Sequence, residues 1–125
     1  MARRDLTGAV DFTYLETYAA QDMALVEEVL GLFREQASIW SRLLDPSQAA
    51  EGWRDAAHTL KGSARSIGAE RLAQACEAVE RAWALGGSGL AERSGVLDAL
   101  DLVLADIAAY LHEQALRSLK TGVMR

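Results

Sequence analysis

The sequence predicts an all-α protein: an antiparallel up-down four-helix bundle with a short additional helix at its N-terminal end. Four long segments repeat apolar residues at spacings of three and four, which is the helical period. The chain has one proline, is rich in alanine, leucine and glutamate, and shows no convincing alternation typical of strands. Short turns join the segments, as in bundles. Its 125 residues indicate a single domain, with a helical core over about 11–116 and frayed termini.

The first two helices each follow an aspartate that can serve as an N-cap. Asp11 precedes a short segment that carries Phe12, Tyr14, Leu15 and Tyr18. Asp22 precedes a helix that should end near residue 44, and its main stripe is Val26, Val29, Leu30, Phe33, Ala37, Trp40 and Leu44. This stripe is widened by Leu25, Leu32, Ile39 and Leu43, so we expect the second helix to be central.

The third helix is expected to begin at Asp45-Pro46, with Asp45 as its cap and Pro46 at its first helical position. It should run to about Ile67, and Gly68 is a natural residue to follow its C-terminus. Its predicted buried stripe is Trp53, Ala57, Leu60, Ala64 and Ile67.

The fourth helix is predicted over about 69–85, and its buried face is Leu72, Cys76, Val79 and Trp83. The run Gly86-Gly87-Ser88-Gly89 predicts a loop. The last helix should run from about residue 90 to about Leu116, with a stripe of Leu97, Leu100, Leu104, Ile107 and Leu111.

Composition and charge exclude several classes of function. The formal net charge of −5 argues against nucleic acid or an anionic membrane as partner. Cys76 is the only cysteine, so an internal disulfide or a multi-cysteine metal site is impossible, and we expect it to be a buried small hydrophobe. No signal peptide and no bilayer-spanning run is recognised, so we expect a cytoplasmic protein.

The most informative residues lie together on one flank of the third helix. At about 100° per residue, His58, Lys61 and Arg65 fall on the side away from the apolar stripe, and Gly62 lies beside them. An exposed histidine with cationic neighbours and a bare patch of backbone suits a nucleophile better than a buried structural histidine.

Other kinds of site have little support. The sequence contains no glycine-rich phosphate loop and no Glu-x-x-His motif, and His112 is the only other histidine, expected on the surface. Ser63 is on the wrong side of its helix to pair with His58. The remaining role is histidine as a nucleophile that accepts a phosphoryl group, which Lys61 and Arg65 can stabilise while a partner supplies the metal ion and an acceptor carboxylate.

The segment from His58 to Leu72, His-Thr-Leu-Lys-Gly-Ser-Ala-Arg-Ser-Ile-Gly-Ala-Glu-Arg-Leu, and on through Cys76 and Glu77, resembles the signature of histidine-containing phosphotransfer (HPt) domains. The predicted helices outside it also fit that family. The resemblance implies a four-helix bundle with a phosphorylatable histidine. It further implies an intermediate in two-component phosphorelays, with no ATP site and no kinase activity of its own.

Carried over by position, the resemblance makes His58 the phosphoacceptor, gives Lys61 a part in holding the phosphate and lets Gly62 permit docking. Some relatives carry a glutamine late in the next helix that hydrogen-bonds the histidine or its phosphate, and the aligned residue here is Glu80. His58 is ten residues before Gly68 and Glu80 is twelve after it, so an antiparallel pair of helices should bring them level. A carboxylate there can orient the imidazole but would repel the phosphorylated form; it can instead turn toward Arg81 or Lys61.

The expected partners are receiver domains of response regulators and a hybrid histidine kinase, with Mg²⁺ bound on the receiver and no intrinsic cofactor. Near the basic patch formed by His58, Lys61 and Arg65, Arg54 can extend the positive charge, and we expect exposed Leu15 and Tyr18 to supply docking contacts.

We expect the protein to be a monomer. The alternatives are a non-catalytic helical adaptor that binds a receiver or kinase, and the phosphoacceptor module of a larger kinase.

Overall fold

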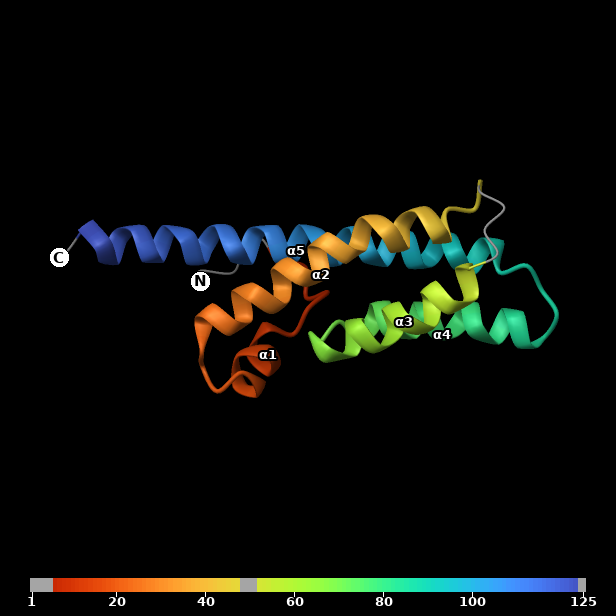
Figure 1. Ribbon diagram of the computed structural model, residues 1–125, viewed down its shortest axis with the longest axis horizontal. Coiled ribbons are helices and arrows are strands. Elements are labelled where there is room, and N and C mark those ends of the chain that lie inside the picture. The colour runs from red at the N-terminus through yellow and green to blue at the C-terminus, as the bar shows by residue number, and fades with distance from the viewer. Residues whose placement is uncertain (1–5, 48–51, 124–125) are drawn as a thin grey trace.

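The computed structural model describes residues 6–47 and 52–123, and this part of the chain contains helices and no strand. The helices are α1 (Phe12–Tyr18), α2 (Met23–Leu44), α3 (Trp53–Ser66), α4 (Glu70–Ala84) and α5 (Leu90–Val123). Figure 1 shows α2 beside the long α5, with α3 and α4 as a hairpin against them. Helix α1 lies at the end where α2 begins and α3 ends. The predicted helical bundle with a short N-terminal helix is confirmed.

Both predicted aspartate caps are present. The side chain of Asp11 accepts a hydrogen bond from the Tyr14 backbone N–H at 3.0 Å, and that of Asp22 accepts one from the Leu25 backbone N–H at 3.1 Å. These bonds satisfy N–H groups that the first turn of a helix leaves without a partner.

The prediction for the start of α3 is wrong. Asp45 ends α2, and its carboxylate accepts hydrogen bonds from the backbone N–H and the hydroxyl of Ser47, at 2.8 and 2.7 Å. A carboxylate bonded to the backbone two residues on closes an Asx turn, so the cap-like pattern at Asp45-Pro46 makes a turn and not a helix. Helix α3 begins only at Trp53, after Gly52, and residues 48–51 of the expected helix lie outside the described residues.

The predicted stripes of α3 and α4 are buried, with one exception. All five predicted core residues of α3 are buried, as are Leu72, Cys76 and Val79 of α4. Burial raises the pKa of the Cys76 thiol to about 12, so it stays protonated at neutral pH. Trp83 is the exception: it is 48% exposed and forms a T-shaped contact with Trp53, at 5.6 Å between ring centroids. It lies in the last turn of α4, at the end of the hairpin.

Helix α5 differs from the prediction in which residues it buries and in where it ends. Leu100 and Ile107 are buried as predicted, whereas Leu97, Leu104 and Leu111 are only partly buried. The remaining core positions of α5, which the predicted stripe missed, are Val96, Val103 and Tyr110. The helix also continues to Val123 instead of ending near Leu116.

The apolar stripe of α2 is wider than its buried face. The main stripe is buried, apart from the partly buried Val29. Leu25, Leu32 and Ile39 are 43–53% exposed. The expectation that α2 is a central helix is therefore wrong, because no other helix in the described part of the chain covers the side that carries these residues. α2 contacts α3 on one side and α5 on another, and leaves an apolar strip uncovered.

A buried carboxylate fastens the N-terminal segment to α5. Asp106 is fully buried and accepts hydrogen bonds from the Thr7 backbone N–H (2.8 Å), the Thr7 hydroxyl (3.1 Å) and the Ala9 backbone N–H (3.0 Å). Nearby, the rings of Phe12 and Tyr110 stack with centroids 4.2 Å apart. These contacts hold the segment that leads into α1 against the bundle.

Gly68 joins this N-terminal segment to the α3–α4 hairpin. Its φ of +79° is in the left-handed region that favours glycine, and a Cβ there would lie 2.9 Å from the Asp11 carbonyl oxygen. Its own carbonyl accepts a hydrogen bond from the Asp11 N–H at 2.9 Å. The turn after α3 is thereby fixed in place, and with it the register of α3 against α4.

Within the described residues, no helix combines the length and the apolarity that crossing a membrane would require.

We predict that Asp106→Ala lowers the free energy of unfolding by about 2–4 kcal/mol, because it removes the three hydrogen bonds that the N-terminal segment donates to this carboxylate. Urea unfolding followed by circular dichroism measures this. The matched control is Asp101→Ala, an exposed aspartate on the same helix, which should change stability by no more than about 0.5 kcal/mol. Equal effects of the two variants would contradict the role of Asp106 in holding the N-terminal segment against α5.

Candidate functional site

His58 stands out from the middle of α3, on the side that borders α4. Its side chain is 70% exposed. Ala57 and Leu60 on either side of it in sequence are fully buried, so the helix is held firmly by its opposite face. An exposed imidazole on a rigid helix is accessible to another protein without movement of the bundle.

Glu80 of α4 holds one nitrogen of this imidazole. Its Oε2 lies 2.8 Å from His58 Nδ1. His58 is ten residues before Gly68 and Glu80 is twelve after it, so the antiparallel hairpin brings the two level. The expected pairing of Glu80 with the histidine is therefore present.

The other oxygen of the same carboxylate is taken by Lys61. Lys61 Nζ lies 2.6 Å from Glu80 Oε1, and the side chains are only 18% and 26% exposed. Glu80 thus contacts His58 and Lys61 at once, whereas the sequence left its orientation open.

Glu80 is ionised at neutral pH. Burial raises the pKa of its carboxyl group, but the contacts and charges of Lys61 and His58 outweigh burial and bring the pKa below its ordinary value. An ionised carboxylate can only accept hydrogen bonds, so His58 Nδ1 must carry the proton. In the neutral imidazole, Nε2 is then left with a free lone pair.

The other cations near His58 also have partners. Arg65 Nη2 lies 3.4 Å from Glu77 Oε2, one turn along the α3–α4 interface, with both side chains partly exposed. The Arg54 guanidinium lies 4.8 Å from the centre of the Trp83 ring and 3.9 Å from the Asp55 carboxylate. The predicted basic patch is thus a row of charge pairs along α3 and α4.

Gly62 leaves a bare patch of backbone one turn from His58. A Cβ at this position would meet nothing within 4 Å, so the fold itself does not require a glycine there. The patch faces away from the core, as the helical spacing predicts.

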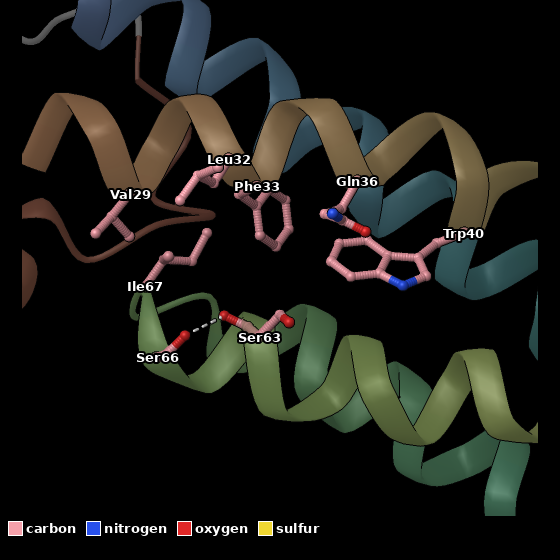
Figure 2. Close-up of a pocket in the computed structure, with 8 residues that line it drawn as sticks. All are labelled: Val29, Leu32, Phe33, Gln36, Trp40, Ser63, Ser66 and Ile67. Carbon is pink, nitrogen blue, oxygen red and sulfur yellow. Dashed lines mark hydrogen bonds between the residues drawn. The ribbon is translucent and has the colours of Figure 1, made fainter.

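An apolar groove between α2 and α3 continues this surface. Figure 2 shows Phe33 and Trp40 of α2 facing Ser63 across it, with Ser66 and Ile67 at the end of α3. Gly62 and Ser66 follow His58 at intervals of four residues. Because four residues make slightly more than one helical turn, each lies a little further around α3, toward Ser63 and the groove. Exposed Leu32 lines it on the α2 side.

The predicted docking residues on α1 are only partly accessible. Leu15 is 3% exposed and belongs to the core, so its assignment to an exposed surface is wrong; Phe12 is buried too. Even a short helix buries the residues on the face that packs on the bundle. Tyr18 is 78% exposed, as expected. Sequence reasoning missed the exposed strip on α2, because its residues have the same spacing as core residues.

Metal-binding groups do not gather around this site. In residues 6–47 and 52–123, no three histidine, cysteine or carboxylate side chains come close enough together to bind a metal ion. His112 is exposed on α5, as predicted.

Comparison with known proteins agrees with this geometry. The family model described as Hpt domain matches residues 14–112. The chain is also similar to a solved structure, the histidine phosphotransferase ShpA from Caulobacter crescentus. The two are 56% identical over 90% of this chain and 99% of that one, with a TM-score of 0.75. No curated protein matched the chain. With an exposed histidine on a helical bundle and a family match over most of its length, the chain belongs to the Hpt domain family.

Proposed function

We propose that this protein is a cytoplasmic phosphorelay intermediate, in which His58 accepts a phosphoryl group from the aspartate of one receiver domain and passes it to the aspartate of another. The observation that carries the proposal is the exposed imidazole whose Nδ1 is held by Glu80, in a chain of the Hpt family. That arrangement favours a free lone pair on Nε2.

The proposed transfer moves only the phosphoryl group and consumes no other reactant. The Nε2 lone pair attacks phosphorus, the N–P bond forms, and the bond from phosphorus to the receiver's carboxylate oxygen breaks. The proton stays on Nδ1, where Glu80 accepts its hydrogen bond, so the carboxylate balances the positive charge that develops on the ring. Onward transfer to a second receiver follows the same steps in reverse: the N–P bond breaks as a bond forms from phosphorus to that receiver's carboxylate oxygen. We place the Mg²⁺ ion that assists the reaction on the receiver, and expect no kinase activity from this chain.

Lys61 and Arg65 bring positive charge to the site, but each is shared with a carboxylate of α4. To contact a phosphoryl group directly, either cation would have to exchange its present partner. Arg65 is the more exposed of the two and pairs at the longer distance, so it is the better candidate for that exchange.

The receiver is proposed to dock over Gly62 and the groove between α2 and α3. Two features support this surface: the open space above Gly62, and the apolar groove beside the end of α3, which exposed Leu32 of α2 lines. Apolar contacts of this kind supply affinity, while the bare backbone lets the aspartate of the receiver approach His58. Tyr18 lies outside the residues that line this groove.

We predict that His58→Gln abolishes phosphorylation. Incubation with a phosphorylated receiver should label the wild-type chain with an acid-labile, base-stable adduct and leave the variant unlabelled. Full labelling of the variant would refute the assignment. If the wild-type chain binds the receiver but no phosphoryl group is transferred to it, the result would instead support a non-catalytic adaptor.

Replacing Glu80 with alanine should slow transfer to His58 about tenfold, which corresponds to about 1.4 kcal/mol of transition-state free energy. The physical reason is loss of the acceptor that keeps the proton on Nδ1. Rapid-quench kinetics with a phosphorylated receiver measures the rate. Glu77→Ala is the matched control on the same helix, and the same loss in both variants would argue against a specific role for Glu80.

Gly62→Gln should weaken receiver binding and transfer at least about tenfold, because the new side chain would stand where the partner approaches. The bundle should remain folded, since a Cβ there has open space. Gly95→Gln is the control: this glycine also lies within a helix, with nothing within 4 Å of its Cβ position. Titration calorimetry with the receiver compares the two, and unchanged binding by Gly62→Gln would refute the docking surface.

A further inference from the structure

We infer that Lys61 acts on His58 through Glu80, as a positioning residue for the carboxylate, and not as a direct ligand of the phosphoryl group. This inference deepens the proposed function and rests on it. It also departs from the role that the family resemblance implies for this lysine.

The first argument is the way the carboxylate is shared. Glu80 has two oxygens, and each has one partner: Oε2 contacts His58 Nδ1 at 2.8 Å and Oε1 contacts Lys61 Nζ at 2.6 Å. With Lys61 at one oxygen, rotation of the carboxylate away from His58 would break a charge pair. Lys61 therefore fixes the atom that orients the imidazole.

The second argument is burial. The Lys61 side chain is 18% exposed, whereas His58 is 70% exposed. The lysine is packed into the α3–α4 interface, while the reactive ring stands out into solvent. An ammonium group that served a phosphoryl group on His58 directly would be expected on the exposed side, with no carboxylate at 2.6 Å.

The third argument is charge. A carboxylate beside the histidine repels a phosphoryl group when it stands alone, and at separations of a few ångströms this repulsion is felt even near a protein surface. Lys61 neutralises Glu80 in place, so the carboxylate can hold the Nδ1 proton with little net repulsion. If Lys61 left to bind the phosphoryl group, it would expose that charge.

A double-mutant cycle tests the inference. Lys61→Met and Glu80→Ala are made singly and together, and single-turnover transfer from a phosphorylated receiver is measured for each. Each single variant should slow transfer about three- to tenfold, and the double variant should be no slower than Glu80→Ala alone. Combining Lys61→Met with Glu77→Ala provides the control cycle, which should be additive because Glu77 pairs with Arg65 instead.

A second measurement does not depend on phosphorylation. Nitrogen-15 NMR of the His58 imidazole should report one dominant tautomer, with the proton on Nδ1, in the wild type. Lys61→Met should shift the ring toward a mixture of tautomers, and Lys61→Arg should restore the wild-type spectrum, because it keeps a cation for Glu80. Loss of structure alone would not produce this pattern of rescue, and circular dichroism verifies that each variant is folded.

Two results would overturn the inference. One is that Lys61→Met slows transfer by the same factor in the wild-type and Glu80→Ala backgrounds, which would mean that Lys61 contacts the phosphoryl group independently. The other is a His58 tautomer that does not respond to Lys61→Met. Failure of the proposed function is distinguishable from both, because the wild-type chain would then acquire no label on His58.

Discussion

The site depends on the register between α3 and α4. His58 and Glu80 are 22 residues apart in sequence, and they meet only because the hairpin turns at one definite place. Gly68 fixes that place: its left-handed backbone and its close contact with the Asp11 carbonyl leave no room for a side chain. A shift of α4 by one residue would rotate Glu80 by about 100° around its helix and remove it from the imidazole.

The N-terminal segment is part of the same constraint. It is held to α5 by the buried Asp106 and to the end of α3 by the backbone bond between Asp11 and Gly68. A segment with little secondary structure thereby links the far side of the bundle to the turn that sets the site. The short α1, which first suggested a docking element, serves mainly as packing through Phe12 and Leu15.

Sequence reasoning succeeded where a helix has one clear boundary and one clear face. α3 alternates a compact apolar stripe with charged residues, so its core positions and the exposed flank of His58 followed directly. The level pairing of Glu80 followed from counting residues on either side of Gly68. Sequence reasoning failed where one pattern fits two structures. An aspartate before proline can cap a helix or close a turn, and Asp45 closes a turn.

The same ambiguity explains the remaining differences. Leu32 has core spacing along α2, but only packing decides which apolar residues a neighbouring helix covers. Trp83 has core spacing too, yet the hairpin ends beside it and leaves it half exposed. The partners of Lys61 and Arg65 also depend on packing, because the α4 carboxylates come within reach only after the helices dock. A flank that looked uniformly basic in sequence is a row of charge pairs in the fold.

The central claim is that Glu80 holds the proton on Nδ1 of His58 and so directs chemistry to Nε2. The most direct measurement is NMR of the phosphorylated, nitrogen-15-labelled protein, with coupling between phosphorus and the ring nitrogens used to locate the N–P bond. The account predicts phosphorus on Nε2 of His58, with a proton retained on Nδ1. Phosphorus on Nδ1, or on another residue, would contradict it.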